Sequence, residues 1–269
     1  MAVFLFPFLG FFARVFQKYI HDEQNFALAV QRVLFPSFDF ELALLALKQD
    51  LLVYLKKVIS YNLHIWDFCL TDLKQQQTDL ELILKQGKDF NKSYLKKEYL
   101  EIEKIQKELL DFLSKVHQTD IQKAEDADQV SSLYQVIIDI GDSSKYLKDV
   151  RDRVEDWQWS TSVNLQKDYE ALRRMVFEFY QSVLALLLNL DNQQTLDFLH
   201  ELLEKIEVHD KEYLTIFRHK EGDDIDLMKL IQVNRYFSMS CMALVKAIEH
   251  IRMDEEEKKY LKEHIEGLF

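Results

Sequence analysis

Glycine and proline are scarce in this chain, with five Gly and two Pro among 269 residues. A fold built from β-strands needs frequent turns, and those turns draw on Gly, Pro and Asn. So few turn formers exclude a sheet-rich fold, and the sequence predicts a chain made mostly of long helices. Because 48% of the residues are hydrophobic, these helices can bury a sizeable core.

Cysteine is also rare, and the patterns of common catalytic sites are missing. Cys69 and Cys241 lie within apolar runs that we expect to be helical, without a Cys-x-x-Cys pair. This favours two buried, reduced thiols over a disulfide framework. The chain contains no Gly-rich phosphate loop, no G-x-S-x-G and no H-E-x-x-H, and it lacks the Glu-x-x-His pairs of a di-iron bundle. The sequence therefore predicts a protein that is not an enzyme.

Positive charge is in short supply, because 46 acidic residues outnumber 34 basic ones and the net charge is −12. Proteins that bind nucleic acid need a concentrated basic surface that displaces phosphate counterions. The balance therefore argues against a nucleic-acid partner. It argues equally against direct capture of free phosphate by this chain.

The most specific pattern present lies at Val130–Val154 (VSSLYQVIIDIGDSSKYLKDVRDRV). It places Asp139 and Asp142 around Gly141 in a run that is otherwise strongly helical. Residues three apart share one face of a helix, and a glycine leaves room for a close neighbour at about 1 kcal/mol relative to Ala. A second segment, Gln232–Ile251 (QVNRYFSMSCMALVKAIEHI), repeats the apolar rhythm one hundred residues later.

These two segments resemble the third helix of a PhoU-type three-helix bundle, whose pattern is N-R-x-L-E-R-I-G-D-x-A-x-N-I. In the first segment Ile140–Asp142 matches the I-G-D of the pattern, and in the second Asn234–Phe237 matches its N-R-x-L opening. The resemblance extends over about Phe38 to Ile251. Because PhoU proteins contain two such bundles in tandem, it implies an all-α fold of two three-helix bundles with six long helices.

The resemblance also implies a metal site, because the family motif binds metal through acidic residues of this helix. It assigns Asp142, with Asp139, as ligands of a divalent or iron-type ion in the first bundle. The family has a further acid four residues before the final Asp, where this chain has Ile138. In the second copy the two acidic positions hold Ser238 and Met242, so no metal is expected there. The alternative for Asp139 and Asp142 is a solvated acidic face, since hard cations want several oxygen ligands.

The first sixteen residues, MAVFLFPFLGFFARVF, contain six Phe and no charge before Arg14. The segment is shorter than the roughly 20 residues of a spanning helix, and it lacks the basic start and cleavage site of a signal peptide. One interpretation is a helix packed on the core or on a second subunit. The other is a membrane anchor, with Arg14 and Lys18 on the cytoplasmic side. The segment resembles the L-P-F element that closes the membrane portion of bacterial sodium/phosphate cotransporters, which a PhoU-like domain follows.

The predicted organisation follows from breaks in the helical pattern. Residues 1–35 form the apolar membrane-proximal helix and linker, 36–160 the first bundle, and 161–269 the second bundle with a short tail helix. Pro36 and Ser37 make a break and an N-cap. Helices are predicted at about 38–70, 71–117 with an interruption near Gly87, 130–154, 164–190, 192–220 and 225–253, with a loop at 119–128 and a separating segment at 157–163.

The resemblance predicts a cytosolic regulatory domain of a sodium-dependent phosphate transporter, at the cytoplasmic face of the inner membrane. It would act through helix-face contacts with a membrane partner, and residues 1–19 would meet the transporter or the membrane surface. The alternative is a free-standing dimeric PhoU-like scaffold that regulates phosphate signalling or transport. A helical metalloenzyme is a third candidate, which the missing ligands disfavour.

Overall fold

The computed structural model describes residues 28, 30, 40–74, 80–85, 90–118, 124–158, 163–188, 193–219 and 225–251. All regular structure in these ranges is helical, and they contain no strand. The all-α prediction is confirmed for this part of the chain. Apart from residues 28 and 30, the predicted apolar segment and its linker lie outside the described residues, as does the predicted tail helix.

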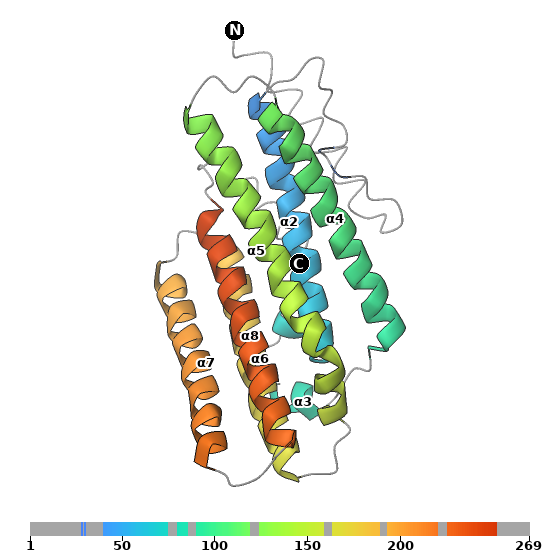
Figure 1. The fold of residues 1–269 in the computed structure, drawn as a ribbon, viewed down its shortest axis with the longest axis vertical. Coiled ribbons are helices and arrows are strands. Elements are labelled where there is room, and N and C mark those ends of the chain that lie inside the picture. The colour runs from blue at the N-terminus through green and yellow to red at the C-terminus, as the bar shows by residue number, and fades with distance from the viewer. Residues whose placement is uncertain are drawn as a thin grey trace. The chain divides into compact units, whose positions relative to one another are not determined.

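Six long helices account for most of the described chain, and five of them lie close to their predicted bounds. The exception is the helix predicted from residue 71, because α4 begins only at Lys92 and the described residues before it form two short elements, η4 and α3. In chain order the elements are α2 (Phe40–Ile65), the 3-10 helix η4 (Asp72–Lys74), α3 (Leu80–Lys85), α4 (Lys92–Gln118), α5 (Ala124–Gln158), α6 (Val163–Leu188), α7 (Gln193–His219) and α8 (Ile225–His250) (Figure 1).

Three further local predictions are wrong. Helix α5 begins at Ala124, inside the predicted loop, and it continues through Trp157, which was expected in the separating segment. Trp157 is 2% exposed, so burial of its large side chain supports the added helical turn. Cys69 was expected in a buried helix, but it lies in the turn after α2 and is half-exposed. Cys241 is buried and free, as predicted.

The chain divides into two compact units, residues 1–50 and 51–269. Helix α2 begins in the first unit and ends in the second. Within the first unit, a carboxylate oxygen of Asp50 accepts a 2.8 Å hydrogen bond from the Val30 amide. The predicted boundary at residue 160 falls inside the second unit, between described ranges, and stays a prediction.

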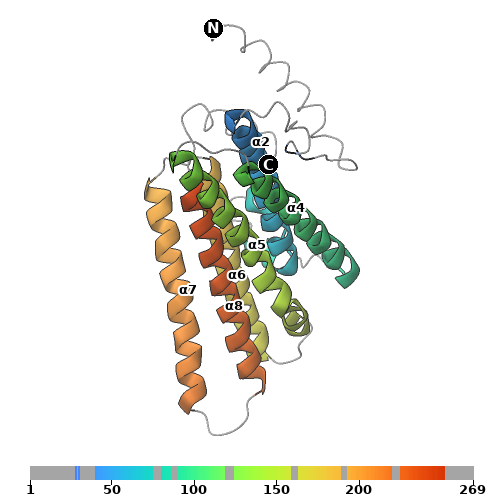
Figure 2. The same ribbon diagram turned by 45° about the horizontal axis from the view of Figure 1, so that its top comes forward.

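In the second unit, α5 and α8 form the most extensive helix pair. Figures 1 and 2 show these two helices side by side in both views, with α4 beside α5 and α7 beside α8. Helix α6 contacts α5, α7 and α8. An aromatic cluster fills the core near α6, where Phe237 meets Trp66 at 5.8 Å and Phe179 at 6.3 Å between ring centroids. The two segments that carry the sequence pattern are therefore packed against each other.

The end of α2 is fixed by its backbone. The Phe68 amide donates to the Leu63 carbonyl at 3.0 Å, and the Asp67 amide donates to the His64 carbonyl at 3.2 Å. This pair of bonds is the Schellman motif, which needs a left-handed residue after the helix. Asp67 supplies that conformation with φ of 60°, and Asp tolerates it better than most residues. The turn directs the Asp67 carboxylate toward α6, where Tyr169 donates to it at 3.4 Å.

None of the helices in the described ranges combines enough length with enough apolar character to cross a lipid bilayer.

Candidate functional site

Gly141 lies where α5 comes closest to side chains of α2 and α4. An added Cβ would lie 2.7 Å from the Tyr54 hydroxyl, and it would collide with the amide nitrogen of Gln106. That amide reaches across α5 to the Ile137 carbonyl at 3.5 Å. Tyr54 is fully buried, so it cannot swing away. The close neighbour that the sequence predicted at this glycine is confirmed, and it consists of two polar side chains.

Asp139 and Asp142 flank this contact on the same helix. Asp139 accepts a hydrogen bond of 2.9 Å from Gln135, one turn earlier. Asp142 is half-buried. Burial raises the pKa of the Asp142 carboxyl, the Lys145 ammonium lowers it, and the negative charge of Asp139 raises it further. The charge of Asp139 therefore acts on Asp142, as expected for residues on one face of the helix, and the ionised form of Asp142 is disfavoured.

A cation placed beside Asp142 would relieve this penalty, because it favours the ionised carboxylate. Within the described ranges, however, no three or more His, Cys, Asp or Glu side chains gather as a metal cage would. Asp139 and Asp142 supply two ligands of the several that a hard cation requires. Metal binding at these residues stays a prediction.

The corresponding part of α8 packs into the core. Ser238 is 5% exposed, whereas Met242 is half-buried. Asn234, at the start of the N-R-x-L match, is 2% exposed, and neither its amide oxygen nor its nitrogen has a hydrogen-bond partner in the described part of the chain. These positions therefore lie inside the bundle.

A chain of buried hydrogen bonds joins α2, α5 and α8. The Asn62 amide donates to Ser143 Oγ at 3.0 Å, and Ser240 Oγ donates to the Ser143 carbonyl at 2.9 Å. Since the Ser240 hydrogen is used in that bond, the Ser143 hydroxyl donates to Ser240 Oγ at 2.9 Å. Burial and the nearby Cys241 thiol raise the pKa of the adjacent Tyr180 phenol, while these three polar side chains lower it. Apart from its small polar residues, no pattern in the sequence indicated this cluster.

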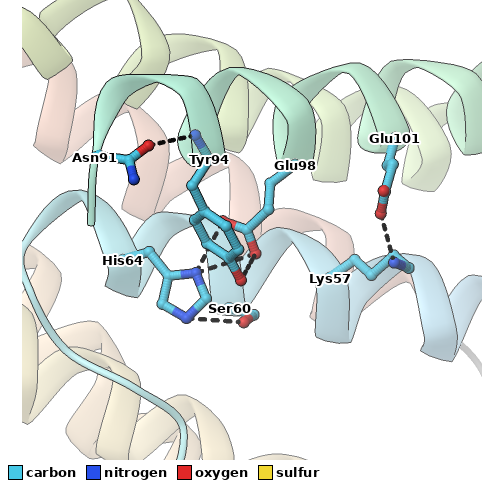
Figure 3. A network of polar contacts seen from close by, with 7 residues as sticks. All are labelled: Lys57, Ser60, His64, Asn91, Tyr94, Glu98 and Glu101. Carbon is cyan, nitrogen blue, oxygen red and sulfur yellow. Dashed lines mark hydrogen bonds and ion pairs between the residues drawn. The ribbon is translucent and has the colours of Figure 1, made fainter. Parts of the chain in front are cut away.

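A second cluster lies between the last turns of α2 and the start of α4 (Figure 3). Nδ1 of His64 lies 2.8 and 3.0 Å from the two carboxylate oxygens of Glu98, and its Nε2 lies 3.4 Å from Ser60 Oγ. The ring of Phe90 stacks on the imidazole at 4.1 Å between centroids. The Tyr94 hydroxyl donates to Glu98 at 3.3 Å. This serine, histidine and glutamate are linked in series.

Sequence reasoning missed this cluster. Its one detectable signal is the four-residue spacing of Ser60 and His64, which puts both on one face of a predicted helix. Glu98 lies 34 residues after His64, on the next long helix, and only the packing of α2 on α4 joins the two. The cluster is therefore a product of the tertiary structure.

No protein-family model, no curated protein and no solved structure gave a significant match to this chain.

Proposed function

We propose that the chain is a PhoU-like regulatory domain of a sodium-dependent phosphate transporter, working at the cytoplasmic face of the membrane. In this proposal α2, α4 and α5 form one three-helix bundle and α6, α7 and α8 form the next. In this regulatory role the domain acts by contact and not by catalysis. It biases transport because its helix faces bind one state of the transporter more tightly than the other.

The observation that carries the proposal is the pairing of α5 with α8. These helices hold the Ile140–Asp142 and Asn234–Phe237 matches, and they form the most extensive contact in the second unit. Such a pairing is expected of a duplicated bundle, since the equivalent third helices can meet along a shared interface. Ser143 and Ser240, which bond to each other, lie next to Asp142 and close to Met242, which occupy equivalent positions of the two segments.

The first nineteen residues add a second line of support from the sequence alone. They contain six Phe, five of them before Arg14, and Lys18 follows the last one, which suits an apolar segment that meets a membrane. Burial of such a segment would contribute several kcal/mol at about 25 cal/mol per Å². A large apolar surface of this kind does not remain in contact with water.

Deletion of residues 1–19 tests the proposal. We expect the shortened protein to be more soluble, to melt within about 2 °C of the full chain because its core is retained, and to lose binding to vesicles of phosphatidylethanolamine and phosphatidylglycerol. Flotation on a density gradient measures the binding. A matched truncation of residues 255–269 should leave vesicle binding unchanged.

The opposite pattern would favour the free-standing dimeric scaffold. In that case the deletion lowers the melting temperature by many degrees, neither form binds vesicles, and light scattering shows the full chain as a dimer that the deletion dissociates. Such a result would remove the membrane partner from the proposal.

A further inference from the structure

Ser60, His64 and Glu98 stand in the order of a nucleophile, a base and an orienting carboxylate. Because a carboxylate only accepts hydrogen bonds, the contact of 2.8 Å with Glu98 places the hydrogen on Nδ1 of His64. Nε2 then lies 3.4 Å from the Ser60 hydroxyl, where its lone pair can accept the hydroxyl hydrogen when only Nδ1 carries a proton. This arrangement is the one that activates a serine as a nucleophile. Hydrogen-bond distances between catalytic side chains are often longer in a free enzyme than in its complex with substrate.

The base is held in position from several sides (Figure 3). His64 is 8% exposed, and the Phe90 ring lies nearly parallel to it at 24°. Tyr94 donates to the same carboxylate that His64 contacts, and its own amide donates to the Asn91 side chain at 2.9 Å, which caps α4. Packing and capping thus fix the imidazole and the carboxylate before any substrate arrives, as catalysis requires.

The serine is reachable from solvent. Ser60 is half-buried, and the side chain of Lys57, one turn earlier on α2, is 39% exposed. The Lys57 ammonium is held 3.1 Å from Glu101 of α4. Lys57 and Ser60 are three residues apart and share one face of the helix. Lys57 therefore adds a positive charge, paired with Glu101, on the face of α2 that carries Ser60.

We propose that this cluster hydrolyses small, uncharged carboxylic esters through an acyl group on Ser60. Ser60 Oγ attacks the carbonyl carbon while its proton passes to Nε2 of His64. The C–O bond to the alcohol breaks, and the leaving oxygen takes that proton. Water then attacks the acyl carbon, gives its proton to Nε2, and the acid departs as the proton returns to Ser60 Oγ. This activity needs neither a metal nor the proposed transporter, so it stands or falls separately from the regulatory role.

The test uses the full chain with p-nitrophenyl acetate and, separately, a fluorophosphonate that labels activated serines. We expect steady release of p-nitrophenol above the buffer rate, and a fluorophosphonate adduct on the peptide that contains Ser60. Ser60→Ala should abolish both signals. His64→Gln should lower both by at least about tenfold, because a positioned base contributes factors of this size or more.

Two matched controls separate this chemistry from general reactivity. Ser132→Ala removes a half-buried helical serine that forms no hydrogen bond with a histidine in the described part of the chain. His200→Gln removes a histidine that pairs with Glu249 at 2.8 Å but has no serine in that pair. Both variants should retain full activity and labelling. Melting temperatures of all variants verify that they are folded.

The outcome that overturns the proposal does not depend on any variant. If folded wild-type protein releases p-nitrophenol at the buffer rate, and the fluorophosphonate leaves Ser60 unmodified, then Ser60 is not activated and the cluster is a structural link between α2 and α4. Equal activity in wild type and Ser60→Ala would overturn it as well, because the reaction would then occur elsewhere on the chain.

Discussion

Asp142 shows how one side chain can oppose the fold that surrounds it. It is half-buried, and its pKa is raised by burial first and by the charge of Asp139 as well. A raised carboxyl pKa means that the folded state holds its proton more tightly than the unfolded chain does. The ionised carboxylate therefore lowers stability. This cost is absent below the ordinary pKa of 3.8 and is fully present above the raised value.

We predict that Asp142→Asn raises the free energy of unfolding at pH 7, modestly because solvent screens a half-buried group. The gain should shrink as the pH falls and vanish below about pH 3.8, where both forms are neutral. Urea unfolding at pH 7, 5 and 3.5 measures it. Asp156→Asn, at an exposed position of the same helix, should change stability by less than about 0.5 kcal/mol at each pH. A stability loss at pH 7 would show that Asp142 has a stabilising partner, such as a bound cation.

At the scale of elements, the pairing of α5 and α8 combines close packing with polar contacts. Ser143 and Ser240 are fully buried and bond to each other, and Asn62 brings α2 into the same chain. Each hydroxyl is both donor and acceptor, so removal of one leaves a buried group unsatisfied. These contacts hold the helices in one register, because a shift of one helix along its axis would break the hydrogen bonds between Asn62, Ser143 and Ser240.

We predict that Ser143→Ala destabilises the protein by about 1 to 3 kcal/mol. The double variant with Ser240→Ala should cost less than the sum of the single changes, with a coupling of about 0.5 to 3 kcal/mol. Chemical unfolding of the wild type, the two single variants and the double variant measures this coupling. Ser182→Ala is the matched control, because Ser182 is also buried but donates only to Glu178 of its own helix. If the stability losses of the two single variants simply add in the double variant, the hydrogen bonds between Ser143 and Ser240 are contradicted.

At the scale of the whole second unit, Arg173 of α6 ties together segments that are distant in sequence. Its Nε donates to the Trp66 carbonyl at 3.0 Å, just after α2 ends, and its Nη1 donates to the Leu84 carbonyl of α3 at 2.7 Å. The guanidinium lies 4.6 Å from the centre of the Phe68 ring. Arg173 is 4% exposed, so its contacts act in a medium that does not screen them. A fork of this geometry is specific to arginine.

We therefore predict that Arg173→Lys destabilises the protein by about 2 to 4 kcal/mol, because two buried carbonyls lose their donors and one ammonium cannot replace the fork. Thermal unfolding followed by circular dichroism measures this loss. The neighbour Arg174 is the control, since its ion pair with Glu81 is 2.6 Å long but exposed on both sides. Arg174→Lys should cost less than about 1 kcal/mol. Similar losses for both variants would mean that burial of Arg173 adds nothing.

The sequence by itself determined the helical class and the approximate bounds of the long helices, except for α4, which was predicted to start at residue 71 and begins at Lys92. This worked because helices depend on local properties: the scarcity of Gly and Pro, and apolar residues recurring with helical period. The spacing of Asp139, Gly141 and Asp142 likewise predicted a shared face and a close neighbour at the glycine. The first is visible in the effect of the Asp139 charge on Asp142, and the second in the close approach of Tyr54 to Gly141.

Only the tertiary structure decided which side chains meet across helices. Glu98 faces His64, Ser240 bonds to Ser143, and Arg173 reaches Trp66 although 107 residues separate the two. Periodicity indicates which face of a helix is buried, but not which helix covers it or at what register. Those choices depend on the packing of all faces at once. The extension of α5 to the buried Trp157 has the same origin, because it is favoured by a contact that no local pattern contains.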